Sequence, residues 1–407
     1  MDYKFIKGGV TAPEGFKAAG VHCGIRKSRS KPDLAMIYSE VPCSAAAVYT
    51  KNLVQGAHIP VTKKNLADGY ARAVICNSGN ANTCNADGIE KAEEMCSLAA
   101  GELGINANDV IVASTGVIGQ VLPIEPIQSA MPALVMSLSK DGSENAAKAI
   151  MTTDTAVKNL AVEYTSLGKT VKIGGIAKGS GMIHPNMGTL LCFITTDAAV
   201  SPAALGSALK AAVGESFNMV SIDGDTSTND TCTVMASGFA GNGKIESENS
   251  NGYSDFTCAL TALCIALARM IAKDGEGASK LVVCSVSGAK DMKNARMLAK
   301  AVIHSSLLKA AMFGADANWG RVLCAIGYSG AETDINNAGV SFSSKAGKVE
   351  VCKNGAGISF DEAAAKKVLS EDEINIFITL CDGSASATAY GCDLTYDYVK
   401  INGEYRS

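Results

Sequence analysis

A single threonine, Thr189, stands between two stretches of opposite character. Residues 174–188 (GGIAKGSGMIHPNMG) carry five glycines, a proline and an asparagine, which is typical of a loop. Residues 190–195 (LLCFIT) are an uninterrupted apolar and β-branched run, which predicts a strand buried on both faces. Cleavage of the Gly188–Thr189 peptide bond would leave the threonine hydroxyl beside a free α-amine at the start of a rigid strand.

This pairing of a hydroxyl with an amine is the chemistry of an N-terminal nucleophile. A threonine hydroxyl needs an adjacent base to attack a carbonyl. An α-amine has a reference pKa of about 7.7–8.0, so it is partly neutral near pH 7 and accepts the proton without help from a histidine. None of the four histidines (His22, His58, His184, His304) lies in a nucleophile motif. On this stretch alone, an ordinary turn before a strand remains the alternative.

A second stretch, ASTGVIG (113–119), follows an apolar run and has the residue types of an oxyanion site. Acyl transfer needs hydrogen-bond donors aimed at the oxygen on which negative charge develops. The Thr115 hydroxyl and the Gly116 N–H would supply two of them. An ordinary turn at a strand end is the competing interpretation.

Acidic residues concentrate in two further turns. SIDGDTSTND (221–230) holds Asp223, Asp225 and Asp230, but it lacks the sixth-position glycine and the distal glutamate of a calcium loop. We therefore expect a hydrogen-bonded turn, with metal binding as the less favoured alternative. KDGEGASK (273–280) places Glu276 between two glycines, where a lone carboxylate is usually solvated.

Composition excludes several classes of protein. The 407 residues are 47% hydrophobic, which is enough for a large core, and 36 basic and 40 acidic residues are mixed along the chain, which argues against a nucleic-acid partner. The start of the chain has no apolar signal segment, and the apolar stretch 258–272 is too short to span a bilayer, so no membrane is expected. Fourteen cysteines without a CxxC pair or zinc spacing indicate a reduced, cytoplasmic protein.

The predicted elements occur in runs instead of strict alternation. Strands are predicted at 34–38, 45–49, 71–76, 109–114, 159–164, 170–176 and 281–286. Helices are predicted at 89–103, 124–138, 201–217, 257–272 and 289–302, followed by a hairpin at 338–353 and a strand-rich end at 374–401. This grouping favours an α+β fold of stacked β-sheets flanked by helices over a doubly wound sheet. No Walker loop is present, because Lys178 precedes the glycine that it should follow.

The stretch KGSGMIHPNMGTLLCFITTD (178–197) resembles the self-cleavage signature of ornithine acetyltransferase, also called glutamate N-acetyltransferase, a family of arginine biosynthesis. Further ordered matches are AVICNSGNANTCNADG (73–88), ASTGVIG (113–119), MTTDT (151–155), SIDGDTSTNDT (221–231), KDGEGASK (273–280), FGADANWGR (313–321) and YVKINGEYRS (398–407). One departure is Gly188, where the family usually has alanine. Glycine holds the backbone less firmly, so the position of cleavage is better defined than its rate.

The resemblance implies self-cleavage into an α chain (1–188) and a β chain (189–407), two copies of each in a heterotetramer, and an N-terminal-nucleophile-like fold. It implies transfer of the acetyl group of N2-acetylornithine to glutamate through an ester on Thr189, with Thr115 and Gly116 as the oxyanion hole. The substrate-binding residues it implies are Thr152, Lys178, Thr189, Glu276, Asn402 and Ser407. No metal or cofactor is implied, and the use of acetyl-CoA as a second acetyl donor stays open.

Two alternatives remain. In the first, the same scaffold is an N-terminal-threonine aminopeptidase or amidohydrolase, in which water takes the second step. In the second, the chain is a non-catalytic binding protein and the glycine-rich loop is only a turn.

Overall fold

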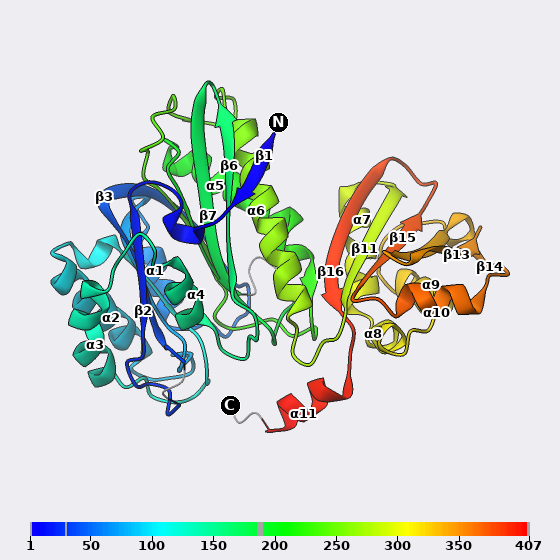
Figure 1. The fold of residues 1–407 in the computed structure, drawn as a ribbon, viewed down its shortest axis with the longest axis horizontal. Helices are drawn as coiled ribbons and strands as arrows, with labels where there is room; N and C mark the ends of the chain where they lie inside the picture. The colour runs from blue at the N-terminus through cyan, green and yellow to red at the C-terminus, as the bar shows by residue number, and fades with distance from the viewer. Residues whose placement is uncertain (1, 29–30, 185–189, 405–407) are drawn as a thin grey trace.

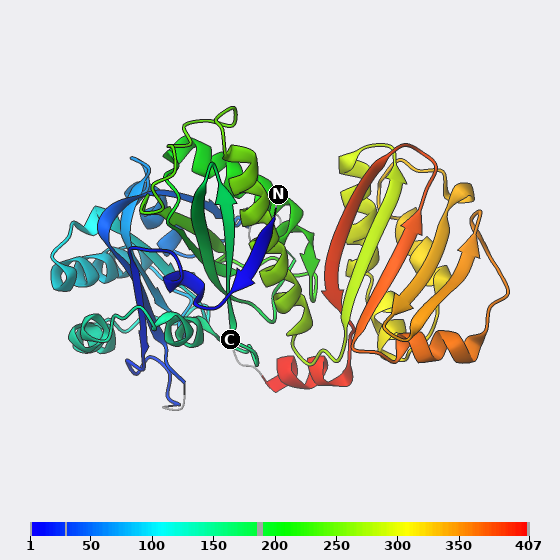
Figure 2. The ribbon, with the colours of Figure 1, turned by 45° about the horizontal axis from the view of Figure 1, so that its top comes forward.

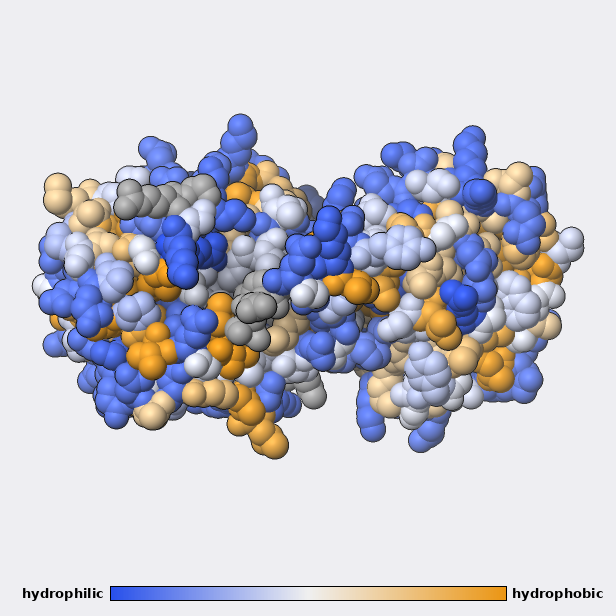
Figure 3. Space-filling model, turned by 90° about the horizontal axis from the view of Figure 1, so that it is seen from below, coloured by the Kyte–Doolittle hydropathy of each residue, from blue (hydrophilic) through white to orange (hydrophobic). Residues whose placement is uncertain are grey.

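The computed structural model describes residues 2–28, 31–184 and 190–404. These residues form two units, each built on one β-sheet (Figures 1 and 2). Seen from below, the units are two lobes joined by a narrower waist, with hydrophilic and hydrophobic side chains mixed over the surface (Figure 3).

The first sheet has the strand order β1-β6-β7-β8-β10-β3-β4-β5, and β2 pairs with β3. The pairs β4–β5 and β8–β10 are parallel, and the other pairs are antiparallel. Its strands are β1 (Tyr3–Ile6), β2 (Phe16–Val21), β3 (Leu34–Tyr49), β4 (Tyr70–Asn77), β5 (Val110–Ser114), β6 (Lys158–Ser166), β7 (Lys169–Lys178), β8 (Leu191–Thr196) and β10 (Thr231–Ala236).

Helices cover both faces of this sheet, which is why β8 is buried along its whole length. Successive side chains of a strand point to opposite faces. Accordingly, Cys192 and Ile194 pack into the core beneath α5 (Pro202–Glu215) and α6 (Tyr253–Lys273), whereas Leu191 and Phe193 pack into the core beneath α4 (Ser143–Ile150). The remaining helices of this unit are α1 (His58–Asn65), α2 (Gly88–Leu103) and α3 (Glu125–Met136).

The second sheet has the strand order β14-β13-β12-β15-β11-β16-β9. Its strands are β9 (Val220–Ser221), β11 (Leu281–Ala289), β12 (Gly339–Ser344), β13 (Gly347–Lys353), β14 (Ala356–Gly357), β15 (Glu373–Thr379) and β16 (Ala385–Cys392). Its helices are α7 (Met292–His304), α8 (Ser306–Phe313), α9 (Trp319–Gly327) and α10 (Glu362–Leu369). Helix α7 packs on β11 and β16, and α10 packs on β12 and β13.

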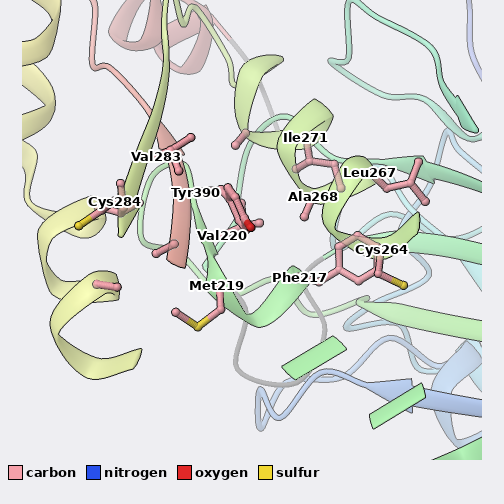
Figure 4. Close-up of a cluster of buried hydrophobic side chains, with 14 of the residues drawn as sticks. Phe217, Met219, Val220, Cys264, Leu267, Ala268, Ile271, Val283, Cys284 and Tyr390 are labelled. Carbon is pink, nitrogen blue, oxygen red and sulfur yellow. The ribbon is translucent and has the colours of Figure 1, made fainter. Parts of the chain in front are cut away.

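One hydrophobic core runs from the first unit into the second through α6, which contacts β6 and β7 on one side and β11 and β16 on the other. Figure 4 shows this junction: Leu267 and Ile271 of α6 lie opposite Val283 and Tyr390 of the second sheet. Helix α6 is also long and apolar enough to cross a membrane, but half of the apolar window that qualifies it is buried inside the protein. A core helix passes the same test, and its packing here is that of a core helix.

The α+β fold of stacked sheets flanked by helices is confirmed. Two local predictions differ from the structure. The strands predicted at 34–38 and 45–49 are the two ends of one long strand, β3. Within the end predicted to be strand-rich, residues from Tyr396 form a helix, α11 (Tyr396–Glu404). No residue of α11 is buried, and a helix satisfies its backbone hydrogen bonds internally where a strand would need a partner.

The predicted division at Gly188 does not coincide with the division between the two sheets. It falls between β7 and β8, which are neighbouring antiparallel strands of the first sheet, and Lys178 pairs with Leu191. The two predicted chains would therefore share one sheet.

Candidate active site

A cavity of about 170 Å³ lies where β5 and β7 end. It brings together residues from seven separate parts of the sequence. The residues that line it are Ala81, Thr115, Gly116, Ile118, Thr152, Thr153, Lys178, Gly181, Met182, Ser227, Thr228, Asn229, Glu276 and Asn402. Six of these lining residues were singled out from the sequence: Thr115, Gly116, Thr152, Lys178, Glu276 and Asn402.

The turn after β5 is built so that Thr115 and Gly116 are held against the loop that follows β4. The Thr115 N–H donates to the Asn77 carbonyl oxygen at 3.0 Å. Gly116 has a φ of +131°, and a Cβ there would lie 2.6 Å from the Gly79 carbonyl carbon, so only glycine fits. The 73–88 motif therefore forms the wall against which the predicted oxyanion residues rest.

Asn229 fixes the same turn from the opposite side. Its buried amide donates to the carbonyl oxygens of Ala81 and Ser114, the second at 2.8 Å, and its Oδ1 accepts from the Thr83 hydroxyl at 2.8 Å. One side chain thus joins the end of β5 to the 73–88 motif. Its hydrogen-bonding groups are fully used, so its role is to hold the wall of the cavity.

Lys178, the last residue of β7, supplies the positive charge. Its side chain is buried, and Nζ donates to the Thr115 hydroxyl oxygen at 3.3 Å. Burial lowers the pKa of this ammonium, whereas the carboxylates of Asp154 and Asp230 oppose that effect. Burial raises the pKa of Asp230 well above its usual range, because its carboxylate lies in the interior. A charged lysine beside Thr115 is suited to attract an anionic group into the cavity.

Glu276 supplies the negative charge. Its carboxylate oxygen Oε2 accepts from the Asn402 amide of α11 at 2.8 Å, and its backbone N–H donates to the Ser180 carbonyl oxygen at 2.8 Å. Glu276 lines the cavity, where the family resemblance implies a substrate-binding carboxylate, although a lone acid in a glycine turn is usually solvated. The C-terminal helix crosses back from the second unit to reach it (Figures 1 and 2).

The predicted nucleophile Thr189, its neighbour Gly188 and the terminal Ser407 lie outside the described residues. The described chain resumes at Leu190, whose carbonyl oxygen accepts from the Thr231 N–H at 2.9 Å, and β8 then continues beside Lys178.

The 221–230 stretch is a hydrogen-bonded turn in the structure. The Asp223 carboxylate accepts from the backbone N–H groups of Ile183 and Met182, the first at 2.9 Å, and so anchors the segment that lines the cavity. Across the described ranges, no cluster of three or more His, Cys, Asp or Glu side chains is placed to hold a metal ion.

Several residues with evident roles were missed from the sequence. Asn229 and the pair Ser227–Thr228 line the cavity, although only the acidic residues of the 221–230 stretch were singled out from the sequence. Asp154 and Lys158, four residues apart, form a buried ion pair together with Asp274. The four-residue spacing is that of a common ion pair. Because such pairs are usually on the surface, only the tertiary structure identifies this one as buried.

The cavity holds groups that acyl transfer uses, namely a lysine, a carboxylate and a threonine–glycine turn, and the sequence comparison places the chain in the acyltransferase class. Residues 17–407 match the sequence model of the ArgJ family. The chain belongs to that family.

Named relatives agree with this assignment. The chain is 48% identical over 405 residues to the arginine biosynthesis bifunctional protein ArgJ of Caldanaerobacter subterraneus, covering 99% of this chain and 100% of the relative. It is 50% identical over 406 residues to the protein of the same name from Symbiobacterium thermophilum, with the same coverage. A crystal structure of arginine biosynthesis bifunctional protein argJ from Bacillus halodurans is 43% identical, with a TM-score of 0.50, and the match covers 52% of this chain and 98% of that chain.

Proposed function

We propose that this protein transfers the acetyl group of N2-acetylornithine to glutamate, in arginine biosynthesis, through an acetyl ester on Thr189. The observation that carries the proposal is the meeting of Lys178, Glu276 and the Thr115–Gly116 turn in one cavity of a chain that belongs to the ArgJ family. Exchange of an acetyl group between two amino acids requires these groups: a cation for the carboxylates, an anion for the ornithine ammonium, and donors for the oxyanion.

In the first step the precursor cleaves itself. The Thr189 hydroxyl attacks the Gly188 carbonyl carbon, the Gly188–Thr189 amide becomes an ester, and water hydrolyses the ester to release the α-amine of Thr189. The Bacillus halodurans structure supports this step, because nearly all of that chain aligns with only 52% of this one, and residues 189–407 would be slightly more than half.

In the catalytic cycle the Thr189 hydroxyl attacks the acetyl carbonyl of N2-acetylornithine while its own α-amine takes the proton. Thr115 and Gly116 donate to the oxyanion, and ornithine leaves with the proton on its amine. The amine of glutamate then attacks the ester carbonyl, giving N-acetylglutamate and regenerating the hydroxyl. One amide replaces another, so the reaction needs no input of energy from a nucleotide.

Substrate recognition follows from charge. Lys178 pairs with the substrate α-carboxylate, and Glu276, oriented by Asn402, accepts the side-chain ammonium of ornithine. Thr152 lines the same cavity, and Ser407, at the end of the chain, completes the proposed set. The Lys178 charge also lowers the pKa of the new Thr189 amine by repulsion, which increases the neutral fraction that acts as base.

Three further features are part of the proposal. The word "bifunctional" in the names of the relatives supports a second activity, and we infer that acetyl-CoA is the second acetyl donor, without a metal or other cofactor. The processed chains, 1–188 and 189–407, assemble as a heterotetramer. The enzyme works in the cytoplasm on small molecules.

Two measurements test the proposal. Denaturing electrophoresis should show two fragments that together account for 41.8 kDa, and Thr189→Ala should remain one intact polypeptide. Thr165→Ala, an exposed threonine of β6, is the matched control and should cleave normally. With N2-acetylornithine and glutamate, the cleaved enzyme should form N-acetylglutamate. A single intact chain with full activity would overturn the proposal.

The same assay separates the alternative enzyme. An aminopeptidase or amidohydrolase would release free acetate from N2-acetylornithine whether or not glutamate is present. The family assignment does not favour this alternative, because the relatives are named for arginine biosynthesis.

A further inference from the structure

Behind Lys178 lies a cluster of buried charges that the mechanism above does not use. Lys158, the first residue of β6, is fully buried and donates to Asp154 Oδ1 at 2.7 Å and to Asp274 Oδ2 at 2.6 Å. Lys178 stands at the same open end of the β6–β7 hairpin, because Lys158 pairs with Ala177. Asp154, Lys158 and Asp274 are not among the described residues that line the cavity.

Asp154 ties two lining segments together. Its Oδ2 accepts from the Thr152 N–H at 3.0 Å, and its Oδ1 accepts from the Gly179 N–H at 2.7 Å. Thr152 and Lys178, the residue before Gly179, are both proposed substrate-binding residues. Because the Asp154 carboxylate binds the backbone of both segments, it fixes the distance between Thr152 and Lys178.

Asp274 ties the same region to the Glu276 turn. Its carboxylate accepts from the N–H groups of Thr155 and Ala156 at 3.1 and 3.2 Å and from the Thr155 hydroxyl. The backbone carbonyl oxygen of Asp274 accepts from the Ser180 hydroxyl at 2.6 Å, and the Glu276 N–H donates to the Ser180 carbonyl oxygen. The cluster therefore connects the three segments that carry Thr152, Lys178 and Glu276.

The charges of the cluster balance when Lys178 is counted. Two carboxylates and one ammonium leave one negative charge, and Lys178 neutralises it. Burial would raise the pKa of Asp154, but the ammonium groups of Lys158 and Lys178 and the Gly179 N–H outweigh burial and lower the pKa to about 2. Buried charges are tolerated when they are paired and hydrogen-bonded, as they are here.

We propose that Asp154, Lys158 and Asp274 are positioning residues, which keep Lys178 charged and hold the Thr152, Lys178 and Glu276 segments in register for substrate. The inference rests on the proposed function, in which those three residues bind the amino acids. The titratable groups that act on Lys178 are Asp154 and Asp230, whose carboxylates favour the ammonium, the Cys76 thiol, which acts in the same sense, and Lys158, which opposes it.

The test uses isosteric variants of the cleaved enzyme. Asp154→Asn removes the counter-ion, so Lys178 should lose its proton more readily. The KM for glutamate and for N2-acetylornithine should rise roughly tenfold, and the pH above which KM increases should fall by about one unit. Asp274→Asn should raise KM similarly without shifting that pH, because Asp274 does not act on the Lys178 charge directly. In both variants kcat should change less than KM.

Two further variants guard against misfolding. Lys158→Met leaves two buried carboxylates against one ammonium and should destabilise the protein. Lys158→Met combined with Asp274→Asn restores the charge balance, so KM should again increase above the same pH as in the parent enzyme. Lys148→Met removes an exposed lysine that pairs with Glu144 at 2.7 Å, and it should change nothing.

The outcomes are distinct. If Asp154→Asn lowers thermal stability but leaves both KM values and their pH dependence as in the parent enzyme, the cluster is only structural and the inference fails. If the parent enzyme transfers no acetyl group, the proposed function fails instead. Calorimetric titration of ornithine into the same variants then decides the positioning role by binding alone, with a tenfold weaker Kd expected for Asp154→Asn.

Discussion

At the scale of residues, the cavity divides substrate recognition between one cation and one anion. Lys178 sits beside Thr115, and Glu276 sits beside Asn402. The two charges come from different segments, and each is held by hydrogen bonds that leave it facing the cavity. Removal of either should therefore change binding of one particular group of the substrate.

Lys178→Met should raise the KM for both amino-acid substrates and lower kcat/KM by roughly 10–100-fold, the value of a charged hydrogen bond. Methionine keeps the apolar stem and loses only the ammonium. Steady-state kinetics with each substrate measure the effect. Lys169→Met, at the exposed start of the same strand, is the control and should behave as the parent enzyme. If the Lys178 variant has the same KM values as the parent enzyme, Lys178 does not bind the substrate carboxylate.

Asp154 should also make stability depend on pH. Its folded-state pKa of about 2 lies below the ordinary aspartate value of 3.8, so the unfolded chain takes up this proton first as the pH falls. The stabilisation, about 2 kcal/mol, is fully present above pH 4 and is lost as the pH falls through 2. Urea unfolding at pH 5 and pH 2.5 measures it. Asp154→Asn should lack this part of the pH dependence, and an identical slope in the variant would contradict the assignment.

At the scale of elements, the site depends on strand ends and on one exposed helix. The β6–β7 hairpin brings Lys158 and Lys178 to the same end of the first sheet. Helix α11 is different, since none of its residues is buried and it reaches Glu276 through Asn402. Packing therefore stabilises the hairpin, whereas α11 contributes chiefly to the site.

Truncation after Thr395 should separate these two roles. Removal of α11 deletes Asn402 and the residues beyond it, so acetyl transfer should fall at least tenfold. Because the helix buries no side chain, the melting temperature should fall by less than about 4 °C. Differential scanning calorimetry and the transfer assay measure both on one sample. A large drop in melting temperature would show that α11 stabilises the fold. Full activity after truncation would show that α11 does not contribute to the site.

At the scale of the whole molecule, the proposed cleavage site lies within a sheet and not between units. Strands β7 and β8 are hydrogen-bonded neighbours, yet one precedes Gly188 and the other follows it. The β8 strand also has a second neighbour, β10, so both fragments contribute strands to a single hydrophobic layer. Cleavage therefore removes one covalent bond and leaves the sheet and its core intact.

The two fragments should consequently remain together after cleavage. In size-exclusion chromatography without denaturant they should elute as one species, and in 6 M guanidinium chloride, a concentration that unfolds typical domains, they should separate. Mass spectrometry of the native peak should find both fragments in equal amounts. Fragments that elute apart under native conditions would exclude the shared sheet.

The local sequence determined many of the elements, and together with the family resemblance it named six of the fourteen residues that line the cavity. The apolar run after Thr189 predicted β8 because a strand covered on both faces has no polar side. The glycine after Thr115 predicted a turn because only glycine reaches a positive φ so close to another backbone. Both predictions depend only on neighbouring residues in the sequence, so they can be made without knowing the fold.

Tertiary structure alone decided which distant residues meet. Asp154 and Lys158 were indistinguishable from surface residues until the fold buried them beside Asp274, because burial depends on elements over a hundred residues away. The helix at the C-terminal end was predicted as strand, since its alternating pattern suits either structure and only the lack of a neighbouring strand selects the helix. The opposition of Lys178 and Glu276 across one cavity likewise depends on the packing of α6 between the two sheets.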